Sequence, residues 1–190
     1  MATLADLFRR LFSRSTPVSV PRPTAAPRSK TRSRLIGGGA AAAALLALVT
    51  TEALHWESLE TTAYRDVVGV WTICIGETKG VRPGMRFTAD ECKSKFATRI
   101  VEFEADMRRC LSAPDAIPGK TYAAFLLATY NIGGGNFCKS SMARRANAGD
   151  LRGACDALLM WNKGGQPLRV IRGLTNRRQA ERKLCLEGLR

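Results

Sequence analysis

The chain has 190 residues, of which 30 are Lys or Arg and 16 are Asp or Glu, so its formal net charge is +14. Hydrophobic residues make up 45% of it, which excludes wholesale disorder, and no run of 18 strongly apolar residues occurs, which excludes a multi-span membrane protein. The length predicts one domain with room for a short extra segment. The charge favours a polyanionic partner, which composition alone leaves open among nucleic acid, an anionic membrane and an acidic cell-wall polymer.

Residues 1–34 carry eight basic residues and one acid, Asp6, together with four of the eight prolines. Such a mixture cannot bury enough apolar area to fold, so we expect a largely disordered basic tail. At its start, apolar residues recur at helical spacing: Leu4, Leu7, Phe8, Leu11 and Phe12. They predict a short basic amphipathic helix suited to a membrane surface, the alternative being a terminus that contacts nothing.

The next segment, residues 35–51, is uncharged but only weakly apolar, with six Ala, three Gly and six Leu, Ile or Val residues. Those six favour insertion by about 2 to 4 kcal/mol in total, and Glu52 opposes it. We therefore predict a weak signal-anchor helix over residues 35–54, which crosses a membrane only marginally. The basic tail would keep the N-terminus in the cytoplasm and export residues 55–190.

Two other interpretations of this segment remain open. It could be a cleaved signal peptide, with Thr51-Glu52-Ala53 as a poor cleavage site. It could also be a buried, Ala-rich helix of a soluble domain.

A pair of carboxylates follows the apolar segment. Glu57 stands where a helix is expected to end, and residues 67–76 favour a small antiparallel hairpin punctuated by Gly69 and Gly76. A helix end and a hairpin start can hold Glu57 and Asp66 across a cleft, as glycoside hydrolysis requires. The spacing alone is weak evidence, because most such pairs are solvated surface charges.

Four further features are expected downstream. Thr88 and Glu91 form a capping-box pattern at a helix start, and residues 123–130 form an apolar stretch that suits a central core helix. Gly133 to Gly135 lack the spacing of a phosphate-binding loop and predict a turn between helices. The Arg-rich stretch 169–183 is interpreted mainly as a solvated face, with some residues left for glycan contacts and for pairing with acids of the cleft.

All six cysteines lie after the apolar segment, and His55 is the only histidine. No C-x-x-C pair or His cluster is present, so we expect no metal site, and disulfides in an oxidising compartment are favoured over buried free thiols. Six cysteines allow fifteen pairings. Expected helix positions favour Cys110–Cys138 and Cys155–Cys185, which leaves Cys74–Cys92.

Several motifs then occur in one order. Glu57, Asp66 and Thr72 lie in a stretch that ends in Gly-Val-Trp-Thr-Ile-Cys-Ile-Gly, and residues 130–137, 147–156 and 173–181 add three more segments. Together they resemble the phage-type lysozymes of glycoside hydrolase family 24, in particular the signal-arrest-release endolysins of phages of Gram-negative bacteria. The resemblance covers roughly residues 54–189.

The resemblance implies an α+β, lysozyme-like fold that is mostly helical with a small antiparallel hairpin lobe. It implies a monomeric, cofactor-free muramidase that cleaves the β-1,4 bond between N-acetylmuramic acid and N-acetylglucosamine in peptidoglycan and lyses the host. Glu57 would be the general acid, and Asp66 and Thr72 would hold and activate water with inversion at the sugar carbon. The carboxyl groups of such a pair lie about 6.5 to 9.5 Å apart.

The resemblance also adds three residues near the catalytic pair: Arg177, Glu77 and Asn131. Arg177 corresponds to an arginine close to the catalytic glutamate. A general acid needs a raised pKa, and the charge of Arg177 opposes this, so either burial of Glu57 must outweigh it or another acid must share Arg177. Glu77 stands where the family commonly has histidine, which removes any role implied for that histidine.

The position of Glu57, six residues after Thr51, predicts control by the membrane. We expect the embedded protein to be inactive and the protein released into the periplasm to be active, with collapse of the membrane potential as the trigger that the resemblance implies. The rival functions are a non-enzymatic, cationic membrane-permeabilising protein, a nucleic-acid-binding protein and a lytic transglycosylase. Export and the lack of a binding motif argue against nucleic acid.

Overall fold

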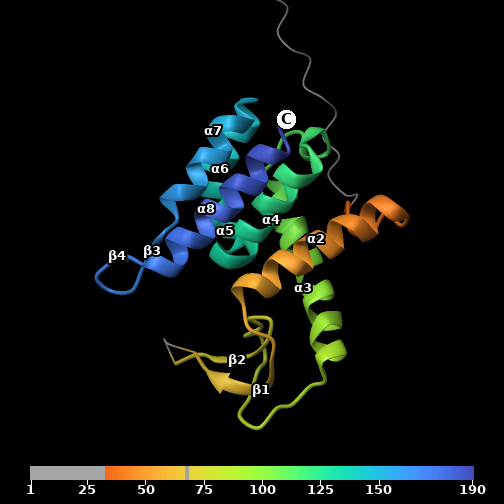
Figure 1. Cartoon of the computed structure of the whole chain (residues 1–190), viewed down its shortest axis with the longest axis vertical. Helices are drawn as coiled ribbons and strands as arrows, with labels where there is room; N and C mark the ends of the chain where they lie inside the picture. Colours follow the sequence, from red (N-terminus) through yellow and green to blue (C-terminus); the bar gives the residue numbers. More distant parts are fainter. Residues whose placement is uncertain (1–32, 67–68) are drawn as a thin grey trace, which may run out of the picture.

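Seven α-helices and two short antiparallel hairpins form the described part of the chain, which comprises residues 33–66 and 69–190 of a computed structural model. The amphipathic helix expected near the N-terminus, and the basic tail up to residue 32, lie outside these residues. The mostly helical α+β fold with a small hairpin lobe confirms the prediction (Figure 1). In chain order the elements are α2 (Ala40–Trp56), β1 (Glu60–Arg65), β2 (Trp71–Cys74), α3 (Ala89–Arg109), α4 (Gly119–Ile132), α5 (Gly134–Lys139), α6 (Ser141–Asn147), α7 (Leu151–Asp156), β3 (Lys163–Gly164), β4 (Arg169–Val170) and α8 (Arg172–Glu187).

The hairpin of β1 and β2 forms a lobe of its own at one end of the molecule (Figure 1). Tyr64 lies opposite Thr72 in its register, and the turn closes through a hydrogen bond from the Gly69 N–H to the Asp66 carbonyl. Gly69 has a φ of +82°, a conformation that costs glycine little. A small core around Ile73 and the Cys74–Cys92 disulfide ties this lobe to α3.

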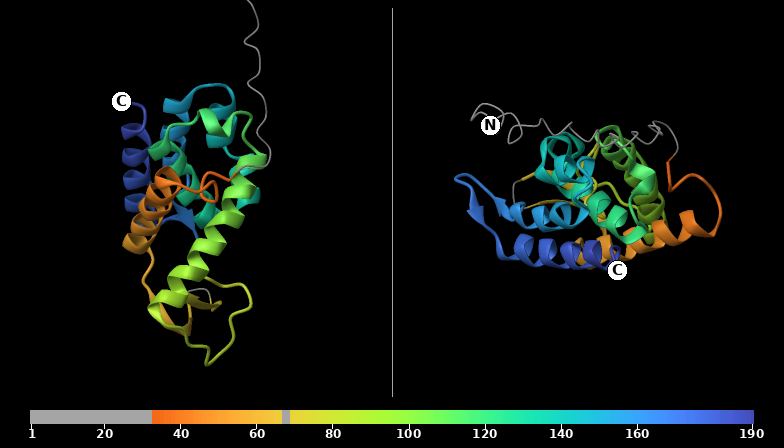
Figure 2. Two further views of the ribbon diagram at one scale, coloured as in Figure 1. Left: turned by 90° about the vertical axis from the view of Figure 1, so that its right-hand side faces the viewer. Right: turned by 90° about the horizontal axis from the view of Figure 1, so that it is seen from above.

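Helix α3 runs from the hairpin lobe to the helical lobe (Figure 2). Its start has the predicted capping box: the Thr88 hydroxyl accepts the Glu91 N–H, and the Glu91 carboxylate accepts the Thr88 N–H at 2.7 Å. These bonds satisfy two backbone donors that a helix start leaves open.

Helix α4 is the centre of the helical lobe, as its apolar sequence predicts. Residues 121–129 are all buried, and α2, α3 and α8 pack around this helix. It ends at Ile132, and Gly133, with a φ of +87°, turns the chain directly into α5. The predicted turn between helices is therefore present.

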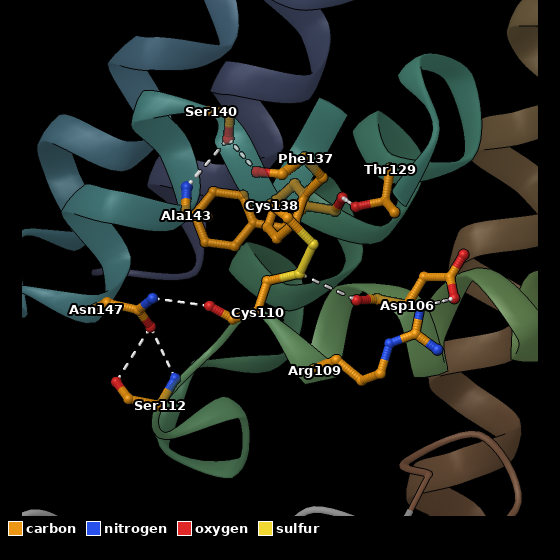
Figure 3. The surroundings of a disulfide bond; sticks show 11 residues. Asp106, Arg109, Cys110, Ser112, Thr129, Phe137, Cys138, Ser140, Ala143 and Asn147 are labelled. Atoms are coloured by element: carbon orange, nitrogen blue, oxygen red, sulfur yellow. Dashed lines mark hydrogen bonds and ion pairs between the residues drawn. A yellow bond between two sulfur atoms is a disulfide. The ribbon is translucent and has the colours of Figure 1, made fainter. Parts of the chain in front are cut away.

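The six cysteines form the same three pairs that the sequence analysis favoured. Cys155–Cys185 joins α7 to α8, and Cys110–Cys138 joins the end of α3 to α5. Beside the latter, the Asn147 amide donates to the Cys110 carbonyl and accepts the Ser112 N–H, both at 2.7 Å (Figure 3). The last residue of α6 thus fixes the chain where it leaves α3.

Helix α2 begins later than the sequence analysis expected, at Ala40 rather than at residue 35. Gly38 and Gly39 both have positive φ values, which interrupt helical geometry before Ala40. The helix packs on α4, and Val49 and Ala53 are completely buried. No helix within residues 33–66 and 69–190 is both long and apolar enough to cross a bilayer. The packing of Val49 and Ala53 makes the Ala-rich helix part of the folded domain in this structure.

A second hairpin, β3 and β4, was not predicted. Its strands have two residues each and its side chains are mostly exposed, so the sequence shows no alternating apolar pattern there.

Candidate active site

Glu57 is held at the end of α2, one residue beyond its last helical position. Its backbone is extended, with a φ of −111°, and its N–H still donates to the Ala53 carbonyl at 2.8 Å. Because Ala53 and Val49 are buried against the core, the packing of α2 fixes where the Glu57 side chain begins. That side chain is 27% exposed, so it remains accessible from solvent.

Arg177 of α8 donates a hydrogen bond from Nη1 to Oε1 of Glu57. The same guanidinium donates from Nε to Glu181 at 3.0 Å, and Arg178 donates to the same Glu181 oxygen at 2.9 Å. The site therefore contains two arginines and two glutamates. A second acid, Glu181, shares Arg177, which was one of the two possibilities raised by the sequence.

The three α8 members of this cluster are buried, with Arg178 completely so. Burial raises the pKa of Glu181 and lowers the pKa of Arg178, because both charged forms lose water there. The part of stretch 169–183 that was expected to pair with acids of the cleft therefore includes Arg177. The interpretation as a solvated face is wrong for Arg178, which is buried, and it holds for Arg169, Arg172 and Lys183, which are exposed.

Asn131, which the sequence analysis listed as a cleft residue, contacts this cluster from α4. Its side-chain oxygen accepts a hydrogen bond from Arg178 Nη2 at 3.1 Å. Arg178 in turn binds Glu181, so Asn131 contacts Glu57 only indirectly, through the chain of Arg178, Glu181 and Arg177.

The end of the hairpin closes the other side of Glu57. A methyl group added to Gly76 would lie 3.6 Å from Glu57 Oε2 and 3.7 Å from the Tyr130 hydroxyl. Tyr130 donates to the Ile75 carbonyl, which joins α4 to the hairpin end. Burial, together with the charges of Glu77 and Glu57, raises the pKa of Tyr130, so this hydroxyl stays protonated.

Asp66 and Thr72 both form hydrogen bonds to the backbone of Val70 in the hairpin. Asp66 Oδ1 accepts the Val70 N–H at 2.8 Å, and the Thr72 hydroxyl donates to the Val70 carbonyl at 3.1 Å. Thr72 is buried and Asp66 half-buried. The hairpin turn thus holds the two side chains in a fixed relation.

Tyr64 lies close enough to Glu57 and to Asp66 to feel the charges of both. Partial burial raises the pKa of its hydroxyl, and the charges of Glu60, Glu57 and Asp66 raise it further. Tyr64 therefore lies within electrostatic reach of both carboxylates that the sequence analysis assigned to catalysis.

Glu77 faces α3. Its carboxylate accepts the N–H groups of Thr78 and Lys79 and lies 3.4 Å from Arg99 Nε, beside a surface groove of about 340 Å³. His55 is exposed on α2, with its ring edge against Trp56.

Three residues of the site were missed by sequence reasoning: Glu181, Arg178 and Tyr130. Glu181 follows Arg177 by four positions and Arg178 by three, a spacing that pairs side chains on one helix face and could have revealed it. Within residues 33–66 and 69–190, no group of three or more His, Cys, Asp or Glu side chains could hold a metal ion.

Comparison with known proteins places this arrangement in context. Residues 54–181 match the family model described as phage lysozyme. A SAR-endolysin of Bacteriophage PS119 is 37% identical over 133 residues, which cover 70% of this chain and 77% of that protein. A SAR-endolysin of Pseudomonas phage phiKMV is 41% identical over 146 residues, covering 75% and 88%. The solved endolysin from Escherichia coli O157:H7 phage FAHEc1 superposes with a TM-score of 0.68 at 29% identity, covering 73% of this chain and 90% of its own.

Proposed function

The chain belongs to the phage lysozyme family, and we propose that it is an endolysin that hydrolyses the β-1,4 bond between N-acetylmuramic acid and N-acetylglucosamine in peptidoglycan and so lyses the host cell. The observation that carries the proposal is the position of Glu57, half-buried between Arg177 of α8 and the hairpin end at Gly76. The names of the phage PS119 and phiKMV relatives agree with it.

In this proposal Glu57 gives its proton to the leaving glycosidic oxygen. Arg177 orients the carboxyl group of Glu57, and the negative charge of Glu181 partly compensates the charge of Arg177. Asp66 and Thr72 hold a water on the opposite face of the sugar. The water oxygen bonds to the anomeric carbon as the glycosidic bond breaks, and Asp66 takes a proton from that water, so the configuration inverts. The reaction needs no cofactor, and the protein acts as a monomer without nucleic acid.

The N-terminal third supplies the control. We assign residues 1–34 to the cytoplasm, residues 35–54 to a weak anchor in the inner membrane and residues 55–190 to the periplasmic catalytic domain. While residues 35–54 are in the bilayer, Val49 and Ala53 cannot occupy their buried sites, and Glu57 loses its support. Release lets the segment fold as α2, which is the arrangement described above.

The products of peptidoglycan digestion test this proposal. Purified full-length protein is incubated with sacculi, and the first products are followed by proton NMR and mass spectrometry. We expect new reducing muramic acid ends formed as the α-anomer. Anhydro ends would instead identify a lytic transglycosylase, and release of cell contents without any bond cleavage would identify a membrane permeabiliser. A Glu57→Gln preparation is the matched control, because it keeps the charge and fold of the rest of the chain.

A further inference from the structure

A second buried carboxylate makes none of the contacts described for Glu57, Asp66 and Thr72. Glu104 of α3 has no exposed surface, and its oxygens accept hydrogen bonds from the Ser33 hydroxyl, the Arg34 N–H at 2.8 Å and the Tyr122 hydroxyl at 2.6 Å. Two of these three donors come from the short segment that precedes α2. The buried acid thus binds the N-terminal approach to the helix that carries Glu57.

The Arg34 side chain adds two contacts to the same region. Its guanidinium lies 4.4 Å from the centre of the Tyr122 ring, and its Nη1 donates to the Ile117 carbonyl at 2.7 Å. Burial and the hydrogen bond to Glu104 raise the pKa of Tyr122, so its hydroxyl remains a donor to the carboxylate. Arg108 also donates to that hydroxyl, at 3.2 Å.

We propose that Glu104 and Tyr122 form a receptor for Ser33 and Arg34, and that this latch holds α2, and through it Glu57, in the catalytic position. Glu104 is then a positioning residue, because it acts on Glu57 only through α2. The latch fastens the start of α2, as the Glu57–Arg177 contact fastens its end.

The apolar packing of α2 explains why a polar latch is needed. The helix buries only four side chains, and two of them are alanines: Ala42, Leu45, Val49 and Ala53. A cavity of about 740 Å³, lined by residues of the Ser33–Leu48 stretch and by Asp115, Gly119 and Lys120, remains between its first half and the start of α4. Because burial stabilises in proportion to apolar area, this half of α2 gains little from packing alone.

The latch forms only in the released chain and not in the membrane-embedded chain, a step that rests on the proposed function. While residues 35–54 span the membrane, Ser33 and Arg34 stay on the cytoplasmic side and Glu104 lies on the other. Glu104 then keeps Tyr122 as a donor but loses Ser33 and Arg34. Because a buried carboxylate that lacks hydrogen-bond donors is costly, the two donors gained from Ser33 and Arg34 favour the folded, released state once the segment has crossed.

Hydrogen exchange of the purified full-length protein tests the latch. Glu104→Gln and Ser33→Ala are compared with Asp106→Asn, a control on the same helix whose ion pair with Arg109 is exposed. For both latch variants we expect the α2 amides of residues 45–53 to exchange at least about tenfold faster, a factor that corresponds to about 1.4 kcal/mol. We expect the exchange of α4 amides to be unchanged, and kcat to fall with KM unchanged. The variant that combines Glu104→Gln with Ser33→Ala should exchange its α2 amides no faster than Glu104→Gln alone.

Unchanged α2 exchange in both latch variants would overturn the proposal. Should Glu104→Gln fail to fold, Ser33→Ala combined with Arg34→Ala carries the same test, because both residues precede the helix and lie at the surface end of the cluster. Glu57→Gln, measured alongside, keeps the two hypotheses apart. If Glu57→Gln is inactive while α2 exchange is unchanged in the latch variants, the latch is wrong and the lysozyme mechanism stands. If Glu57→Gln is active, the mechanism is wrong, whatever the α2 exchange of the latch variants.

Discussion

Arg177 Nη1 donates a hydrogen bond to Glu57 Oε1, although the two residues are 120 positions apart in the sequence. The contact joins the end of α2 to the middle of α8, two helices from opposite ends of the described chain. Because Glu181 shares the same guanidinium, the Glu57 carboxyl is oriented by a cation whose charge is already partly balanced. The position of Glu57 therefore depends on the docking of both helices on α4.

Removing the arginine should damage both stability and activity. Arg177→Ala leaves Glu181, which is almost completely buried, with Arg178 as its remaining cation among the described contacts. Breaking a buried ion pair costs about 3 to 5 kcal/mol, so urea unfolding should show a loss of that order. Arg172→Ala, on an exposed position at the start of α8, is the control. A loss equal to that of the control would show that the buried cluster does not hold the fold.

Acid should lower the stability of the fold at the start of α3, and the substitution Glu91→Gln should remove this pH dependence. The Thr88 N–H and hydroxyl hold the pKa of Glu91 below its ordinary value of 4.5. A lowered pKa in the folded state means that the ionised carboxylate stabilises the fold above pH 4.5, and that this contribution is lost as the pH falls through the lower value. Glu91→Gln keeps the capping hydrogen bonds but does not titrate.

The measurement is the melting temperature at neutral pH and at successive pH values below 4.5. We expect Glu91→Gln to lose less stability on acidification than the wild type does. Asp90→Asn, an exposed acid of the same helix turn outside the capping box, should follow the wild type. Parallel curves for wild type and Glu91→Gln would contradict the role of this carboxylate.

Stronger anchoring should delay release without disturbing the folded form. Ala43 and Ala47 are exposed on α2, one turn apart, so leucine at both positions adds apolar surface without entering the core. Two leucines should favour membrane insertion by roughly 1 kcal/mol. Leucine at Gly38 or Gly39 would be ambiguous, because both have positive φ values and the docked form would be strained as well.

The readout for this pair of substitutions is the fraction of protein in the membrane before and after the potential is collapsed, together with the time of lysis. We expect a larger membrane-bound fraction and later lysis, with normal activity of the purified protein. Ala43→Ser with Ala47→Ser, of similar size and lower apolarity, should shift both quantities the other way. Unchanged timing in both variants would exclude control by release.

Local features of the fold could be predicted from the sequence, because their causes are local. The Thr88–Glu91 capping box needs residues three apart, and the buried run of α4 shows as a continuous apolar stretch. Glu57 and Arg177 were found through motifs of the lysozyme family. The start of α2 was misplaced because an uncharged run does not show that glycines inside it break the helix.

The partners of Glu104 and of Asn131 could not be predicted, because they lie far away in the sequence. Glu104 binds Ser33 and Arg34 across 71 and 70 positions, and Asn131 contacts Arg178 across 47. Each of these residues alone resembles an ordinary surface group. Only the packing of α3, α4 and α8 brings them together and removes them from water.

The rate of glycan cleavage by Glu57→Gln tests the central claim most directly. Glutamine keeps the size of the side chain and an oxygen for Arg177, but it carries no proton to give to the leaving oxygen. We predict that the rate at which new reducing ends appear from purified sacculi falls at least about 100-fold, the usual contribution of a general acid, while the far-UV circular dichroism stays unchanged. A folded Glu57→Gln protein that cleaves within about twofold of the wild-type rate would contradict the assignment of Glu57 as the general acid.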